Sequence, residues 1–238
     1  MTRIINMWAS PRNVSSAMMY AWAQRLDTTV WDEPMYGNYL EVTGIDHPLA
    51  SHILEAVPKD AAEIIDRMLH TEWPTPIAFY KNMAHHLVGI DIEIVNHMDN
   101  FLLTRDPADM LPSLAKGLGR TPSMQDAGYD LQIAIVDRIV DSGRTPIVVD
   151  SRSVLEDPER TLIALCESLD VAFDPAMMTW PSGPKPYDGV WGQHWYTRLH
   201  SSSGFEPYVP RHKPLPEPLE ELHEACTPLY QRLMKFAI

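Results

Sequence analysis

Cysteine is scarce in this sequence: Cys166 and Cys226 are the only two among 238 residues. Because they lie far apart and form no CxxC pair, they cannot build a disulfide framework or a zinc ribbon, and we expect a cytoplasmic protein. The sequence also lacks any apolar run near the roughly 20 residues that cross a bilayer. Its first residues, Met-Thr-Arg-Ile-Ile-Asn-Met-Trp, indicate a strand and not a signal peptide. We therefore expect no membrane partner.

Basic residues are also few, with 19 Lys and Arg against 32 Asp and Glu, which gives a formal net charge of −13. A protein of this charge does not suit the phosphate backbone of nucleic acids, so no nucleic-acid partner is expected. A small anionic ligand remains compatible with the composition when a local cluster of donors holds it. The sequence also shows no cluster of metal ligands: His85 and His86 are adjacent, and neighbouring residues cannot share one face of a helix or strand. We expect no metal site.

Five short apolar runs predict β-strands, and amphipathic segments between them predict α-helices. The runs cover residues 3–9, 30–32, 77–80, 101–104 and 147–149, and the clearest helical patterns cover 47–57, 60–70 and 124–140. Asp-Pro pairs at 106–107 and 157–158 are typical of helix starts. Strands that alternate with helices indicate an α/β fold with a parallel sheet of about five strands and helices on both faces.

Proline is abundant, with 21 residues, many of which follow Trp180. This composition predicts a largely irregular segment late in the chain. We expect a single domain over 1–238, with the sheet core in 1–178, an irregular C-terminal flap in 179–216 and a terminal helix in 217–238. In such sheets ligands bind beyond the carboxyl ends of the strands, so the loops that follow the strands hold the candidate site residues.

The first of these loops, residues 10–16, joins the first strand to the first helix. Backbone N–H groups at a helix N-terminus favour a phosphate. Ser15 and Ser16 add hydroxyl donors, and Arg12 adds a fixed positive charge with a planar fork of donors. The loop lacks the pattern G-x-x-x-x-G-K-[ST]. It predicts an anion site, with a plain serine-capped helix as the alternative.

The same loop resembles the 5′-phosphosulfate loop of sulfotransferases that use 3′-phosphoadenosine 5′-phosphosulfate (PAPS). In the bacterial and Golgi-type branches that loop commonly runs Pro-Arg-Ser-Gly-Thr-Thr. Two residues of this chain depart from it, since an asparagine replaces the usual small residue and a valine the usual glycine. The resemblance implies that the donor is bound by Pro11, Arg12, Asn13, Val14, Ser15 and Ser16.

A second stretch, residues 101–113 (FLLTRDPADMLPS), resembles the 3′-phosphate motif of the same family. That motif is an apolar strand, then Arg-x-Pro, then a serine eight residues after the arginine. The resemblance implies that Arg105 and Ser113 bind the 3′-phosphate; an arginine in a surface salt bridge is the alternative. Residues 148–174 resemble a third, mainly structural, segment of the family.

Together the three matches imply a P-loop-type fold and a transferase of the sulfotransferase class. Such an enzyme moves a sulfonate group in line from PAPS to a hydroxyl or amine of a small-molecule acceptor. The other product is adenosine 3′,5′-bisphosphate, and the transfer needs no metal. Arg12 would act electrostatically, because arginine cannot release its proton near neutral pH. Two alternatives stay open: a P-loop nucleotide-dependent kinase, and a non-catalytic, degenerate sulfotransferase-like binding protein. A homodimer is also left open.

The catalytic base has two sets of candidates. Glu33 follows a short apolar segment, and in some Golgi-type and bacterial sulfotransferases a glutamate in a similar position acts as the base. Burial would raise its pKa toward a useful value. Lys81 matches the lysine of the Lys-Thr-His motif of cytosolic sulfotransferases and would contact the substrate, but a methionine, Met83, occupies the histidine position. The second set of candidates for the base, or for a contact to the acceptor, consists of histidines. These are His85, His86 and, less strongly, His194 and His200.

Overall fold

The computed structural model describes residues 2–210 and 214–238. Its centre is one sheet of five strands in the order β2-β3-β1-β4-β5. All four strand pairs are parallel. The predicted fold class is therefore confirmed. The strands are β1 (Arg3–Ala9), β2 (Thr28–Asp32), β3 (Ile77–Met83), β4 (Asp99–Thr104) and β5 (Val148–Asp150).

The central strand β1 marks the point where the winding of the chain reverses. From β1 the chain builds β2 and β3 on one side and then crosses to β4 and β5 on the other. Loops that leave neighbouring strands in opposite directions open a crevice at the carboxyl end of the sheet, and this crevice is where ligands bind in such folds. The topology therefore places residues 10–16 at its centre.

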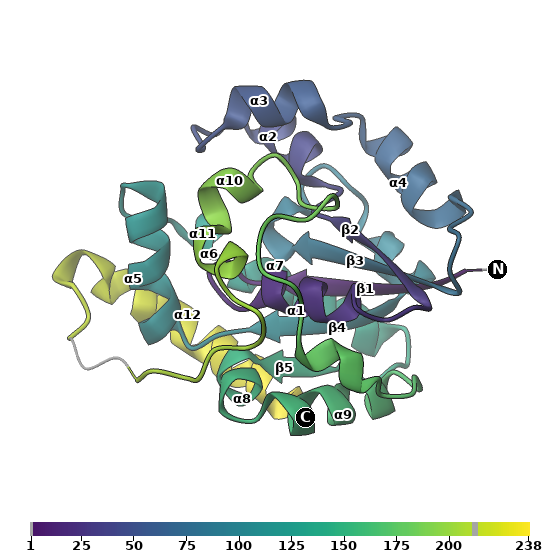
Figure 1. Ribbon diagram of the computed structural model, residues 1–238. Helices are drawn as coiled ribbons and strands as arrows, with labels where there is room; N and C mark the ends of the chain where they lie inside the picture. Colours follow the sequence, from purple (N-terminus) through teal and green to yellow (C-terminus); the bar gives the residue numbers. More distant parts are fainter. Residues whose placement is uncertain (1, 211–213) are drawn as a thin grey trace.

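Helices cover both faces of the sheet (Figure 1). Because successive strand side chains point to opposite faces, Trp8 packs in one core and Met7 in the other. The helices over the Trp8 face are α4 (Ala61–His70), α5 (Pro107–Leu118), α7 (Tyr129–Asp141) and α12 (Glu220–Leu233). The helices over the Met7 face are α1 (Ser15–Trp22), α8 (Ser151–Glu156) and α9 (Pro158–Ser168).

A third, smaller core lies between α2 (Tyr36–Thr43), α3 (Ala50–Ala56) and α10 (Gly192–Trp195). Figure 1 shows α10 and the following α11 (Thr197–His200) beside the carboxyl ends of the strands. The segment expected to be irregular thus contains two short helices. Short 3-10 helices are η1 (Ala84–His86), η2 (Ile92–His97), η3 (Pro175–Met178), η4 (Glu217–Leu219) and η5 (Met234–Phe236).

Several element boundaries differ from the sequence-based expectation, and two of these differences bear on the candidate site. Strand β3 does not end at Tyr80 but continues to Met83, because its register with β1 is kept as far as the pair Ala9 and Met83. The helix predicted over 124–140 is two helices, α6 (Met124–Ala127) and α7, separated by Gly128. Gly128 has φ +73°, a left-handed conformation that ends α6 and that glycine adopts at low cost.

Two predicted helix starts are confirmed. The carboxylate of Asp106 accepts the backbone N–H of Ala108 at 2.8 Å and Pro107 occupies the first turn of α5. Asp157 caps α9 in the same way.

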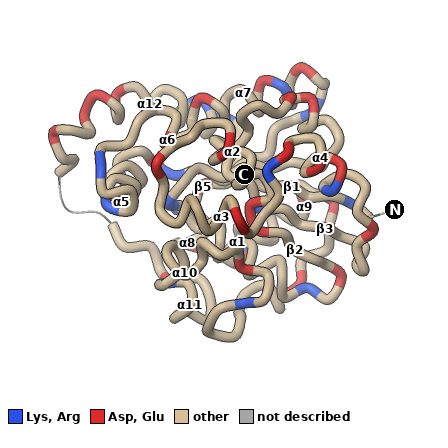
Figure 2. The backbone as a smooth tube through the Cα atoms, turned by 90° about the horizontal axis from the view of Figure 1, so that it is seen from above, with Lys and Arg blue, Asp and Glu red and all other residues tan. Residues whose placement is uncertain are grey.

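Figure 2 shows the acidic positions spread over the outside of the fold. Within residues 2–210 and 214–238, no helix has the length and apolar character to cross a membrane.

Candidate active site

A cavity of about 350 Å³ is lined by the loop after β1, the ends of β2 and β3, Arg105, the second half of α5, and the segment from Trp195 to Val209. It contains every predicted site residue with two exceptions, His194 and His200. The candidates that line it are Pro11, Arg12, Asn13, Val14, Ser15, Ser16, Glu33, Lys81, His85, His86, Arg105 and Ser113. The structure thus brings both proposed phosphate-binding segments and all three candidate bases to one cavity.

The loop after β1 is held by its asparagine. The Asn13 side chain donates to the carbonyl of Leu103 at 2.9 Å and accepts the backbone N–H of Ser15 at 2.9 Å. Val14 precedes α1 without capping it by a side chain, and its φ of −92° is open to any residue. The left-handed position of the loop is Arg12, with φ +54°. The glycine of the related loops is therefore not needed for the backbone at position 14.

Two arginines meet at this loop. Arg105 donates from Nη1 to the carbonyl of Arg12 at 2.7 Å, and Arg12 donates from Nε to Ser113 Oγ at 3.2 Å. Burial and the nearby Arg105 lower the pKa of Arg12. Neither arginine forms an ion pair with a carboxylate in the part of the chain that the structure describes. Two adjacent guanidinium groups without a counterion among the described residues are suited to bind phosphate or sulfate groups.

A second charged cluster lies at the ends of β2 and β3. Lys81 donates from Nζ to Asp32 Oδ1 at 2.9 Å, to the Tyr196 hydroxyl at 2.6 Å, and to the carboxylate of Glu33. Asp32 and Lys81 are paired across the two strands. The Tyr196 hydroxyl also donates to Asp32, at 2.8 Å. Because Tyr196 belongs to the late segment of the chain, these bonds fasten that segment to the sheet.

The charges of this cluster do not cancel, since one ammonium faces two carboxylates in a buried environment. Burial raises the pKa of Glu33 to about 7; Lys81 opposes this rise and Asp32 adds to it. Burial alone would lower the pKa of Lys81, but Asp32 and Glu33 together raise it well above its ordinary value. The lysine is therefore a fixed cation, and Glu33 is the group that titrates near neutral pH.

Two histidines complete the wall beside Glu33. His86 Nδ1 lies 3.7 Å from Glu33 Oε2, and the His86 ring stacks on Tyr36 and Tyr39 with centroid separations of 4.5 and 4.7 Å. His85 and His86 both line the cavity although they are adjacent, because they lie in the 3-10 turn η1 and not in a regular strand or helix. Burial lowers the pKa of His85 to about 3 and that of His86 well below its ordinary value, so both rings are neutral.

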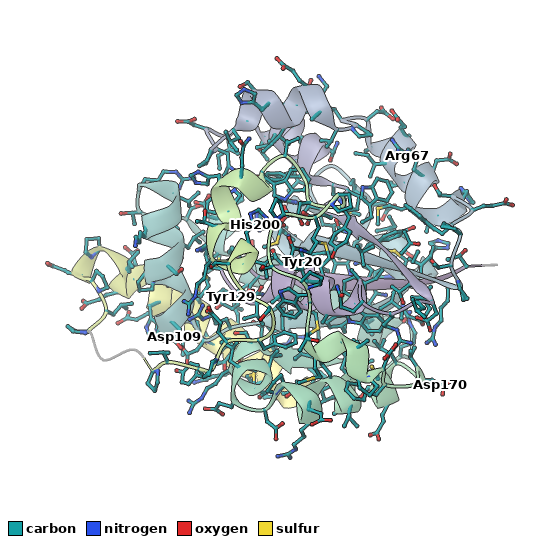
Figure 3. The ribbon with its side chains drawn as sticks, in the orientation of Figure 1. Tyr20, Arg67, Asp109, Tyr129, Asp170 and His200 are labelled. Atoms are coloured by element: carbon teal, nitrogen blue, oxygen red, sulfur yellow. The ribbon has the colours of Figure 1, made fainter. Side chains whose placement is uncertain are left out.

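The other two predicted histidines lie elsewhere. His194 is exposed and does not line the cavity, so the structure does not place it with the other candidates. His200 Nε2 contacts Asp188 Oδ2 at 3.0 Å, and the Tyr20 hydroxyl donates to the same oxygen at 2.7 Å. Figure 3 shows His200 and Tyr20 near one another. This contact anchors the late segment to α1.

Among residues 2–210 and 214–238, no three His, Cys, Asp or Glu side chains are arranged to hold a metal.

Some cavity residues escaped the sequence analysis. Tyr36, Tyr39, His47 and Asp126 line the cavity but were not predicted. Tyr36 and Tyr39 are three residues apart, just after Glu33, a spacing that places both on one face of a helix. That spacing is the feature of the sequence that could have predicted the two tyrosines. No comparable pattern in the sequence marks His47 or Asp126 as cavity residues. Trp195 also lines the cavity, and its ring centroid lies 5.4 Å from the Arg12 guanidinium carbon.

Comparison with known proteins identifies the family. Residues 2–237 match the family model described as "Sulfotransferase domain". The chain therefore belongs to the sulfotransferase family. Its fold is similar to that of a sulfotransferase from Alicyclobacillus acidocaldarius, with a TM-score of 0.58 and 11% identity over 99% of this chain and 95% of the other. The sulfotransferase domain from the curacin biosynthetic pathway gives a TM-score of 0.50 and 14% identity, over 99% and 97%.

Two curated relatives from Arabidopsis thaliana are more similar in sequence. Branched-chain-amino-acid aminotransferase-like protein 1 is 34% identical over 233 residues, and protein 2 is 33% identical over 233 residues. Each match covers 97% of this chain but only 41% of the relative, so the chain spans about two fifths of the length of these proteins. The likeness therefore concerns one part of each relative.

Proposed function

We propose that the chain is a sulfotransferase that takes a sulfonate group from PAPS and transfers it in line to a hydroxyl or amine of a small-molecule acceptor. The observation that carries this proposal is the meeting of two guanidinium groups, Arg12 and Arg105, in the cavity that also contains Glu33; neither has a carboxylate partner among the described residues. Membership of the sulfotransferase family supports the reaction class. The donor is our assignment.

The donor end of the cavity contains groups that fit two phosphate-type anions. Arg12 and the N-terminal turn of α1 would hold the 5′ end, and Arg105 with Ser113 would hold the 3′-phosphate. When bound, PAPS supplies an activated sulfonate whose leaving group is adenosine 3′,5′-bisphosphate. Arg12 stabilises the negative charge that develops on the leaving oxygen as the bond to sulfur breaks. Its guanidinium is held ready by Ser113 and by the Trp195 ring.

The acceptor end of the cavity contains Glu33. With a pKa of about 7, Glu33 is partly ionised near neutral pH and still basic enough to accept a proton from the attacking group. Lys81 holds one carboxylate oxygen of Glu33 in place. His85 and His86 are weaker bases because burial lowers their pKa values, so we assign them to the positioning of the acceptor.

The test is transfer of radiolabelled sulfonate from PAPS to a pool of small hydroxyl and amine compounds. We expect transfer by the wild-type chain and a loss of about 100-fold or more in Glu33→Gln, in the range of general base catalysis. The matched control is Glu72→Gln, at an exposed glutamate between α4 and β3. Glu33→Gln should bind adenosine 3′,5′-bisphosphate as the wild type does. Full transfer by Glu33→Gln would show that Glu33 is not the base.

A further inference from the structure

The cavity wall on the Glu33 side is made of aromatic rings. Tyr36 and Tyr39 stack on the His86 ring, and His85 contacts Tyr39 with a centroid separation of 5.2 Å. The wall continues through His47, whose ring lies 5.6 Å from both Tyr36 and Trp195. These rings contact one another, so the wall is preformed. An acceptor bound here meets the parts of these rings that line the cavity, and Trp195 contacts both His47 of this wall and Arg12 at the donor end.

The charges of the cavity are divided between its two ends. At the donor end, Arg12 and Arg105 have no carboxylate partner among the described residues. On the acceptor side the cation Lys81 is already bonded to Asp32 and Glu33. The remaining charged groups of the lining are paired, Asp126 with Arg120 at 2.8 Å and Arg198 with Glu206. No described cation beside Glu33 is left to neutralise an anionic acceptor.

Unengaged polar groups are also few on this wall. The Tyr36 hydroxyl is hydrogen bonded to His47 Nδ1 at 2.5 Å. The side chains of His85 and His86 make no hydrogen bond within the described residues, and their Nδ1 atoms are fully buried. Their Nε2 atoms and the Tyr39 hydroxyl are the groups of this wall that are left to meet a polar atom of the acceptor. A sugar, with many hydroxyl groups to satisfy, would leave most of them unpaired against this wall.

From this wall, and given the proposed function, we infer that the acceptor is an uncharged aromatic alcohol whose ring packs on Tyr36, Tyr39 and Trp195. A carboxylate on the acceptor would be buried without a counterion. An ammonium group would pair with Glu33 and occupy the lone pairs that the base needs. In transfer, the acceptor hydroxyl gives its proton to Glu33 and its oxygen forms the new bond to sulfur. The bond from sulfur to the 5′-phosphate oxygen breaks, and its electron pair stays on that oxygen.

Four compounds of similar size test the inference by calorimetry at about pH 7.5, where their charges differ. They are 4-ethylphenol (neutral), 4-hydroxyphenylacetate (anionic), tyramine (cationic) and 4-ethylcyclohexanol (neutral, not aromatic), titrated into protein saturated with adenosine 3′,5′-bisphosphate. We expect 4-ethylphenol to bind at least about tenfold more tightly than either charged compound, and about threefold more tightly than the cyclohexanol. Equal or tighter binding of a charged compound would overturn the inference, and so would tighter binding of the cyclohexanol.

Two substitutions locate the site. Tyr39→Leu should weaken 4-ethylphenol about fivefold or more, while Tyr187→Leu, outside the cavity lining, should not. Leu118→Lys adds a cation to the lining and should improve binding of 4-hydroxyphenylacetate, a gain that misfolding cannot produce. No gain in Leu118→Lys together with no loss in Tyr39→Leu would refute the placement. If the bisphosphate does not bind at all, the proposed function fails, and titration of the free protein still decides whether the wall selects uncharged rings.

Discussion

The raised pKa of Glu33 links stability to pH, and Glu33→Gln exposes this link. The rise from 4.5 to about 7 corresponds to about 3 kcal/mol, at about 1.4 kcal/mol for each pH unit. Because the folded state binds this proton more tightly than the unfolded state, the contribution is fully present below pH 4.5 and is lost as pH rises through about 7. Glutamine carries no charge at any pH, so the Glu33→Gln variant does not lose stability in this way as pH rises.

Urea unfolding measured at a series of pH values tests this reasoning. The free energy of unfolding of the wild type relative to Glu33→Gln should fall by about 3 kcal/mol from about pH 4.5 to above pH 7. The same comparison with Glu72→Gln should stay level, because Glu72 is exposed. A pH-independent difference between the wild type and Glu33→Gln would refute the buried, uncompensated carboxylate. The rate of sulfonate transfer should rise with pH over the same interval, as Glu33 ionises.

Two further substitutions test the supports of the site. Tyr196→Phe removes the hydroxyl shared by Asp32 and Lys81, so the free energy of unfolding should fall by about 1–3 kcal/mol in urea denaturation and transfer should slow, whereas Tyr187→Phe should leave transfer unchanged. Gly128→Ala should destabilise by about 1–2 kcal/mol through its positive φ and also slow transfer, because the new Cβ would lie 3.3 Å from His85 Cβ. Gly143→Ala has a similar φ with open space around it, so thermal unfolding should show the strain alone, with normal transfer.

The sequence predicted strands where apolar residues dominate. Strand β1 has the predicted bounds, residues 3–9, and β4 ends at Thr104 as predicted but begins two residues earlier, at Asp99. Prediction failed where consecutive polar side chains lie inside the sheet. Strand β3 continues through Lys81 and Asn82 because both find buried partners, Asp32 for the lysine and Asn6 at 2.8 Å for the asparagine. A local hydrophobic pattern cannot show that such partners exist.

The candidate site divides in the same way. Arg12 and Arg105 belong to short motifs that follow strands, so their place beside one cavity could be predicted from the chain. Tyr196 lies 164 residues from Asp32, and nothing in the spacing of either residue indicates that their side chains meet. The sequence analysis predicted that His85 and His86 cannot share one face, because adjacent residues do not do so in a regular helix or strand. Both line the cavity because that rule does not hold in a 3-10 turn. Contacts between distant segments, and irregular turns, are what the folded chain adds.

The central claim is that Arg12 and Arg105 hold the two ends of one adenosine 3′,5′-bisphosphate moiety, and calorimetry without magnesium tests it most directly. The wild type should bind adenosine 3′,5′-bisphosphate at least about tenfold more tightly than adenosine 5′-phosphate, the worth of one charge-assisted contact. Arg105→Gln should abolish this preference, whereas Arg160→Gln, an exposed arginine on α9, should keep it. Equal affinity of the wild type for both nucleotides would contradict the account. Tighter binding of ATP than of adenosine 3′,5′-bisphosphate, in a parallel titration with magnesium, would also contradict it.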